Sequence, residues 1–193
     1  MRLLPTPITQ PGAEPVTRAQ AKLDCRIDDA DTSLDAVLDS KIVTARRMAE
    51  HETGRKLITQ VWRAEFADWP TATDVITLSP AQSAAVSYWS GSDWVALNVS
   101  QFVMLHNDTS TGVTIVPALN VTWPTLAFAI GPRVRVDVTV GYGDEAEDVP
   151  ECIRDWIRAH VAAMVRKPEA TTDRAETVLP YLSSMLDSVR SWA

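Results

Sequence analysis

Valine takes every second position in the segment RVRVDVTV, residues 133–140, which carries the clearest strand pattern of the chain. Because successive side chains of a β-strand point to opposite faces, the four valines face one way and the residues between them face the other. A strand with one buried and one wet face is typical of an antiparallel sheet. Gly141 and Gly143 follow at once, and they allow a tight exit that residues with a Cβ atom would resist.

The end of this strand spells TVGYGD, residues 139–144, the letters of the carbonyl-lined filter of potassium channels. Such a filter needs flanking membrane-spanning helices of about 20 apolar residues. The longest charge-free stretch, 109–132, is interrupted by Gly112, Pro117 and Pro124, so it cannot form a continuous apolar helix. We interpret the filter letters as a coincidence and expect no membrane association.

Period-two patterns predict further strands before this one. Ile58, Trp62, Ala64 and Phe66 lie along one side of an extended stretch. The turn SGSD at 90–93 separates two alternating runs, which predicts a β-hairpin. The apolar positions of this hairpin are Val86, Tyr88, Val95, Leu97 and Val99. Short strands are also expected at 102–105 and 113–116.

Helical periodicity appears before the strands. The first helix is expected to open with a capping box between Thr17 and Gln20. The second spans 32–54, with Asp31 or Thr32 as its N-cap and Gly54 as its C-cap. The predicted apolar stripes are Val16, Ala19, Leu23 and Ile27 in the first helix, and Leu34, Val37, Leu38, Ile42, Ala45, Met48 and Ala49 in the second.

Two more helices are predicted after the strands. One opens with Asp148 as N-cap and Pro150 at its first position, and it ends before Pro168. Its apolar stripe comprises Val149, Ile153, Trp156, Ile157, Val161, Met164 and Val165. The last helix begins near Pro180 after a polar linker, and one of its faces carries Leu182, Met185, Leu186, Val189 and Trp192.

These patterns predict an α+β fold: a small α-helical bundle of N-terminal and C-terminal helices, with a β-rich antiparallel insertion in the middle. We expect one domain over 1–193, since a chain of 193 residues that is 46% hydrophobic can bury one core. Four prolines make residues 1–15 an extended arm. The other predicted boundaries are 16–56 and 149–167 for the helical core, 57–143 for the insertion, and 168–193 for the linker and last helix.

The net charge of −7 argues against a protein that grips nucleic acid, because such proteins neutralise phosphates with clustered lysines and arginines. It does not exclude a protein that DNA merely passes. The N-terminus lacks an apolar segment of signal-peptide length, so we expect an intracellular protein. In a reducing compartment, Cys25 and Cys152 are expected to be buried thiols and not a disulfide.

Signals for chemistry are weak. The acidic residues of the loop DEAED, 144–148, could hold a divalent ion, but acids before a helix also stabilise its positive end, and we favour this second interpretation. The histidines show no pair at metal-ligand spacing; they are His51, His106 and His160. A nucleophile elbow, a phosphate-binding loop and a dinucleotide fingerprint are all lacking. We therefore expect no catalytic, cofactor-binding or metal-binding residue.

Tryptophans and arginines supply candidate positions for a subunit interface. Trp89 and Trp94 flank the predicted hairpin tip, and aromatic residues are enriched in subunit contacts. Arg133 and Arg135 lie on the wet face of the valine strand, where they could meet an acidic neighbour or remain solvated.

Four phrases of the chain carry a resemblance. They are EPVTRAQAKLDCRID at 14–28, ETGRKLITQVW at 52–62, VTVGYGDEAEDVPECIRDWIRAHVA at 138–162 and, more weakly, LPYLSSMLDSVR at 179–190. In this order they resemble the head-tail connector (adaptor, or head-completion) proteins of long-tailed bacteriophages, which also occur in prophages and gene transfer agents. None of the phrases is a catalytic motif, so no active-site residue is carried over.

The resemblance implies a structural virion protein of the neck, made in the cytoplasm of the bacterial host. Such proteins form a ring, of twelve copies, under the portal, which extends the DNA channel and offers a platform for the next neck protein and the tail. Double-stranded DNA would pass through without sequence-specific binding. The subunits look monomeric in solution and order their termini or loops on docking.

On this basis we predict that the last helix docks on the portal through Leu182, Met185, Leu186, Val189 and Trp192. Two alternatives stay open. One is another neck or tail component, such as a stopper or tail terminator, which would be chiefly a β-barrel. The other is a metal-dependent enzyme that uses the loop 144–148.

Overall fold

The computed structural model describes residues 4–106, 112–166 and 184–190, and this part of the chain combines three α-helices with antiparallel β-sheet. It divides into two compact units. The sheet unit contains the described residues of 1–11 and 59–141, and the helical unit contains those of 12–58 and 142–190. The arm up to Pro11 therefore belongs to the sheet unit.

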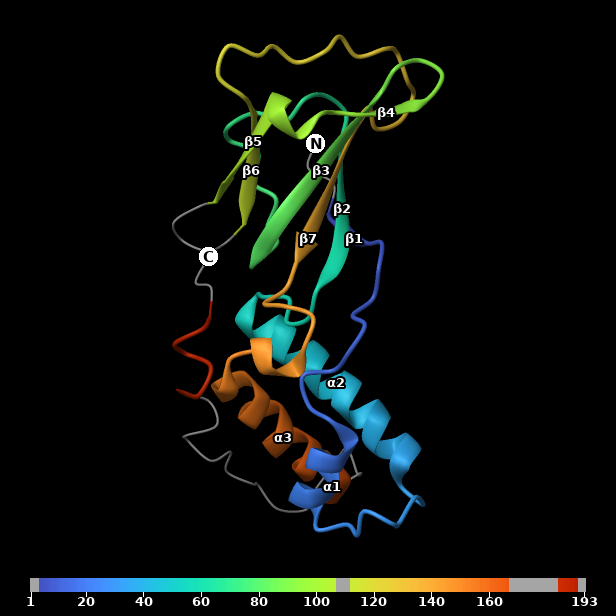
Figure 1. Ribbon diagram of the computed structural model, residues 1–193, viewed down its shortest axis with the longest axis vertical. Coiled ribbons are helices and arrows are strands. Elements are labelled where there is room, and N and C mark those ends of the chain that lie inside the picture. Colours follow the sequence, from blue (N-terminus) through green and yellow to red (C-terminus); the bar gives the residue numbers. More distant parts are fainter. Residues whose placement is uncertain (1–3, 107–111, 167–183, 191–193) are drawn as a thin grey trace, which may run out of the picture. The chain divides into compact units, whose positions relative to one another are not determined.

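The sheet unit holds a five-stranded sheet and a separate two-stranded sheet (Figure 1). In spatial order, the larger sheet consists of β1 (Thr6–Pro7), β2 (Gln60–Phe66), β7 (Val134–Val140), β3 (Ala81–Trp89) and β4 (Trp94–Ala96). The smaller sheet pairs β5 (Phe102–His106) with β6 (Val113–Pro117). All paired strands are antiparallel, as the sequence predicts.

The valine strand is the centre of the larger sheet. β7 pairs with β2 on one side and with β3 on the other, so that Val136 lies opposite Ala64 and Val86. All four of its valines are fully buried, which confirms the predicted face. Burial of one such side chain stabilises the fold by about 1.5–3 kcal/mol. Leu97, which follows β4, and Phe102 and Ile115 of the smaller sheet belong to the same core.

The remaining strand predictions are confirmed as well. β3 and β4 form the predicted hairpin, closed by a 3.0 Å hydrogen bond from the Ser90 N–H to the Asp93 carbonyl. β5 and β6 each extend one residue beyond the predicted strand. However, Val95 and Val99 of the hairpin region are exposed, not buried.

The helical unit contains α1 (Arg18–Cys25), α2 (Asp35–Thr53) and α3 (Glu151–Arg166). Its core gathers side chains from all three helices; they include Ala21, Leu38, Ile42, Ala49, Ile153 and Ile157. The capping box of α1 is confirmed: Thr17 Oγ1 accepts from the Gln20 N–H at 3.2 Å, and Gln20 Oε1 accepts from the Thr17 N–H at 2.9 Å. Gly54 ends α2 in the left-handed conformation, as predicted.

The predicted stripe of α1 is wrong at two positions. Ala19 and Leu23 are exposed, while Ala21 and Lys22 are buried. Lys22 can be buried because its Nζ lies 2.8 Å from the Asp35 carboxylate and donates to the Asp29 carbonyl at 2.9 Å. The aliphatic stem of Lys22 is thus buried where the sequence pattern predicted burial of Leu23.

The start and one side of α2 also differ from the prediction. The helix begins at Asp35, and its N-cap, Leu34, makes no side-chain capping bond. The carboxylate of Asp31 accepts from the Ser33 N–H at 2.9 Å and so stabilises the preceding turn instead. Three predicted core positions of this helix are partly exposed, namely Leu34, Val37 and Met48. Polar residues occupy the buried side in their place, namely Arg46, Glu50 and Thr53.

The TVGYGD phrase makes the exit from β7. Gly141 has a φ of 130°, and a Cβ atom on Gly143 would overlap the carboxylate of Asp148. That carboxylate accepts from the Glu145 N–H at 3.0 Å, so Asp148 is not the N-cap of α3, which begins at Glu151. The predicted stripe of α3 is confirmed at its buried positions, Ile153, Trp156, Ile157 and Val161. Among the described helices, none is long and apolar enough to span a membrane.

Both cysteines are unpaired, as expected, but each is half-buried. Burial raises the pKa of the Cys25 thiol above its ordinary value, which keeps the thiol protonated near neutral pH.

Candidate interaction surfaces

The outer face of the larger sheet carries Arg135, one of the predicted interface residues. Arg135 lies opposite Glu65 in the strand register, and its Nε donates to the Glu65 carboxylate at 2.8 Å. Its guanidinium also lies 3.8 Å from the ring centroid of Trp94, a cation–π contact. The structure therefore brings Arg135 and Trp94 together within one copy.

Other charges on this face are also paired. Arg63 binds the Asp137 carboxylate through two hydrogen bonds of 2.6 and 2.7 Å, and this bonding raises the pKa of the Arg63 guanidinium. Arg133 donates to the Ala67 carbonyl at 2.6 Å and to Asp68 at 3.2 Å. These arginines are satisfied inside the subunit, so an acidic neighbour would have to compete with existing bonds.

Trp89 and Trp94 form a cross-strand pair at the end of the β3–β4 hairpin. Their ring centroids are 5.8 Å apart with planes tilted by 60°, and both side chains are half-buried. Such a tilted arrangement is favourable for aromatic rings. Their part in a subunit interface stays a prediction, since each tryptophan keeps an accessible side.

Sequence patterns do not reveal a second aromatic cluster. Trp69 stacks on Trp123 with a centroid distance of 4.5 Å and lies 5.7 Å from Tyr88. The Trp69 indole also donates to the Pro124 carbonyl at 2.8 Å. This cluster fixes the irregular segment between β6 and β7 onto the sheet unit. The sequence signal that the two tryptophans share is a proline at the next position, Pro70 and Pro124.

Exposed apolar side chains gather on the part of the sheet unit that follows the hairpin turn. Residues 94–132 contain a single charged residue, Asp108. We call their exposed apolar side chains on β4, β5 and the adjoining turns the uncharged flank; it comprises Val95, Val99, Val103, Leu105 and Leu119. Phe128 and Ile130, the latter fully exposed, lie beyond it in the segment before β7. Contiguous exposed apolar surface is typical of protein–protein contact sites.

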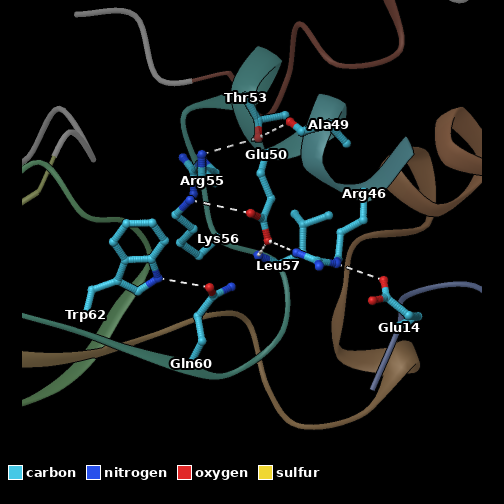
Figure 2. Close-up of polar contacts among 10 residues, drawn as sticks. All are labelled: Glu14, Arg46, Ala49, Glu50, Thr53, Arg55, Lys56, Leu57, Gln60 and Trp62. Atoms are coloured by element: carbon cyan, nitrogen blue, oxygen red, sulfur yellow. Dashed lines mark hydrogen bonds and ion pairs between the residues drawn. The ribbon is translucent and has the colours of Figure 1, made fainter. Parts of the chain in front are cut away.

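A buried charged network lies in the helical unit (Figure 2). Glu50 on α2 accepts from Arg46 at 3.1 Å, and Lys56 lies 3.4 Å from its second oxygen. Arg46 in turn donates to Glu14 at 2.8 Å, and Glu50 also accepts from the Leu57 N–H at 3.4 Å. Burial raises the pKa of Glu14, with the Arg46 charge opposing this shift. The network links the segments before and after α2.

A groove of about 440 Å³ also lies in the helical unit. Its apolar lining comes from Ala13, Val16, Ile42 and Val43, and its acidic lining from Glu14, Asp39, Glu145 and Glu147. Arg18, a further lining residue, is paired with Asp35 at 3.0 Å and with Asp39. This lining can receive an apolar side chain of a partner, and it offers no pair of nucleophile and base for catalysis.

The acidic loop uses its side chains for local structure. Asp148 bonds the Glu145 N–H, as described above. Within the ranges that the structure describes, no three His, Cys, Asp or Glu side chains are grouped to hold a metal ion. The ring of His160 stacks on Trp156 at 3.6 Å, and its Nδ1 lies 2.9 Å from the Trp156 carbonyl.

The predicted portal-docking face is only partly described. Leu182 and Trp192 lie outside the described residues, as does the linker. Met185, Leu186 and Val189 belong to a segment of turns following Ser184, not to a regular helix. Leu186 is 0% exposed within the helical core, and Met185 and Val189 pack against this core. Docking of this face on a portal stays a prediction, and it would require these side chains to leave the helical core.

The fold can be compared with known proteins. Neither a scan against protein-family models nor a search of curated proteins finds a match. Among solved structures, a chain of "Neck of empty GTA particle computed with C6 symmetry" is similar, with a TM-score of 0.77 and 18% identity over 99% of this chain and 97% of that chain. A chain of "Virion of native gene transfer agent (GTA) particle" gives a TM-score of 0.77 at 16% identity, with the same coverage.

A third similar chain comes from "Neck of native GTA particle computed with C12 symmetry", with a TM-score of 0.65 and 16% identity over 99% of this chain and 97% of that chain. At these identities the similarity establishes the fold. The likeness extends over nearly the whole of each chain.

Proposed function

We propose that this protein is a structural component of the neck of a phage-like particle. The observation that carries the proposal is the whole-chain similarity of fold to chains from gene transfer agent particles, two of them from structures of the neck. Fold alone does not determine function, but a neck protein needs surfaces for partners and no reaction centre. The paired charges and exposed apolar residues of the sheet unit agree with this requirement.

Within the neck, we propose the role of head-tail adaptor: a ring of twelve copies under the portal, which extends the DNA channel and receives the next neck protein and the tail. The phrases in the sequence support this role through their resemblance to connector proteins. The C6 and C12 symmetries of the similar neck structures agree with a cyclic assembly. A ring requires two different surfaces on each subunit that join head to tail.

The proposed channel role agrees with the electrostatics of the chain. A conduit should hold DNA weakly, because each retained phosphate contact would oppose passage. The net charge is −7, and Arg63, Arg133 and Arg135 on the outer face of the sheet are each paired with an acid. DNA would therefore pass without sequence-specific binding.

The C-terminal segment, in this proposal, docks on the portal. Leu186 now fills a place in the helical core, so the portal would have to replace those apolar contacts. Docking would then exchange intramolecular for intermolecular burial. The segment would lose its contacts in the helical core and some conformational entropy, and the new contacts with the portal would have to offset both.

The two alternatives are weaker. A stopper or tail terminator would be chiefly a β-barrel, whereas the described part of this chain also holds the three α-helices α1, α2 and α3. An enzyme that uses the loop 144–148 would need its carboxylates for a metal, but Asp148 is engaged with the backbone of the loop.

Deletion of the gene in a particle-producing strain tests the proposed function. We expect DNA-filled heads without tails to accumulate, and wild-type protein supplied in trans to restore joining. As a matched control, the Leu23→Ala variant is supplied in trans. The Leu23 side chain is exposed on α1, so its truncation should leave joining intact. Normal particles from the deletion strain, or a particle structure without this chain between head and tail, would refute the proposal.

A further inference from the structure

The N-terminal arm forms one edge of the larger sheet. β1 is the edge strand, and the Ile8 N–H donates to the Val61 carbonyl at 2.8 Å while Thr9 Oγ1 accepts from the Val61 N–H at 2.8 Å. The arm is thus held along β2. Leu4, 84% exposed, and Ile8, 47% exposed, are nevertheless directed into solvent.

This edge cannot extend the sheet by strand addition. Pro5 and Pro7 lack N–H groups, and prolines are a common means of blocking edge pairing. A partner must therefore contact the arm mainly through side chains. Residues 3–13 contain no charged residue, so apolar contact would require little desolvation of charge.

The opposite edge of the same sheet is β4, and the uncharged flank continues from this strand. Leu119 is 91% exposed and Val99 is 74% exposed, and the Ala118 N–H bonds the Gln101 carbonyl at 3.0 Å, which brings the two turns that carry them together. Val103 lies opposite Val116 on the β5–β6 pair next to these turns. Val99, Val103 and Leu119 of the flank are therefore carried by segments that are bonded or directly joined to one another.

We propose that these two edges are the complementary halves of the contact between neighbouring copies, with the arm of one copy lying on the uncharged flank of the next. The inference rests on the proposed ring and names the surfaces that would close it. Surfaces on opposite edges of one sheet are different from each other, which is the condition for head-to-tail assembly. Both are apolar and without charge, so each matches the other better than it matches a charged partner.

A second copy is favoured over another protein for a further reason. The two edges belong to the same sheet, so the two neighbours of each copy in a ring would cover both of its edges at once. If the flank received a different protein, the arm with Leu4 and Ile8 would remain exposed in the assembly. Exposed apolar surface of this kind is unusual in a finished assembly.

Cysteine cross-linking tests this contact. The background carries Cys25→Ser and Cys152→Ser, and its folding is checked by circular dichroism. Ile8→Cys is combined in one chain with Val99→Cys, Val103→Cys or Leu119→Cys in turn. A short bis-maleimide is applied to the full-length protein at high concentration and to particles from cells that produce each variant.

At least one combination is expected to give a ladder of dimers, trimers and larger species in the particles. Each single-cysteine variant should give at least tenfold less cross-linked product. A charged substitution, Leu119→Glu, should reduce cross-linking through Val99→Cys at least tenfold. Leu23→Glu, at a site of α1 that is also largely exposed, should not change it.

The inference is overturned if no combination exceeds the single-cysteine variants in either setting, if Ile8→Cys links to itself, or if it links to a different protein. These outcomes are separable from failure of the proposed function. A chain found between head and tail without such a ladder would refute only this contact. A ladder from protein that is absent from particles would refute only the neck assignment.

Discussion

Replacement of Leu186 by alanine measures how firmly the C-terminal segment is held by the helical unit. The side chain is 0% exposed and lies in the core beside residues of all three helices. Leu→Ala changes at such sites cost about 2–5 kcal/mol, the upper end applying where the cavity cannot collapse. The segment is also held by Met185 and Val189, which pack against this core, and by an exposed ion pair of 3.0 Å between Arg190 and Glu52, which contributes at most about 1 kcal/mol. Because the segment consists of turns and not of a regular helix, it can shift to fill part of the space, and we expect a loss of about 2–3 kcal/mol.

The assay is urea unfolding of the full chain, followed by circular dichroism at the helical signal. The control is Leu23→Ala, a leucine that is 74% exposed on α1, which should change the free energy of unfolding by less than about 0.5 kcal/mol. Equal midpoints for the two variants would refute the reasoning. They would mean that Leu186 is not retained in the core in solution and that its face is free for a partner.

Three further outcomes follow from the helical unit. Glu50→Ala removes one acceptor from the buried Arg46, which keeps its bond to Glu14, and should cost about 1–3 kcal/mol in urea unfolding; an unchanged midpoint would contradict this. Burial raises the pKa of Glu14 in the folded state. Below the ordinary value of about 4.5 the group is protonated in both states and costs no stability; as the pH rises toward the folded-state pKa, ionisation of the buried carboxyl lowers the free energy of unfolding. The stability of the wild type relative to Glu14→Gln should therefore fall as the pH rises from about 4 to 7, and a rising or flat difference in midpoints would show that the Arg46 charge prevails. In Gly143→Ala, the new Cβ atom would overlap the Asp148 carboxylate and force it away from the Glu145 N–H. The free energy of unfolding should fall by about 1–2 kcal/mol, the usual value of a lost capping bond. An unchanged thermal unfolding midpoint would show that the Cβ atom is accommodated without this loss.

Local patterns predicted the elements well because they depend on neighbours in sequence. The valine strand, the capping box of α1 and the Gly54 cap each result from short-range stereochemistry. The buried side of a helix was harder to predict wherever a polar group replaced an apolar one. Lys22 and Arg46 are buried because acids from other segments neutralise them, and periodicity of apolar residues cannot detect that.

The surfaces were predicted less well than the fold. Trp89 and Trp94 could be paired from the hairpin turn, but the contact of Arg135 with Trp94 depends on β7 and β4 lying on either side of β3. The Trp69–Trp123 stack joins segments that no local pattern relates. Val99 was predicted as an apolar position of the hairpin and Leu119 fell in no predicted element, so only their exposure in the structure identifies them as surface residues.

The position of β7 between β2 and β3 has a consequence for synthesis on the ribosome. β2 and β3 are made early, but they are not neighbours in the sheet, so each waits for Val134–Val140 before it gains a partner along its length. The helices wait longer, because α1 and α2 are completed by α3 near the other end of the chain. The nascent chain therefore keeps its apolar strands open until more than two thirds of it has been translated. Over that interval the exposed apolar side chains and unpaired strand edges make the nascent chain prone to aggregation.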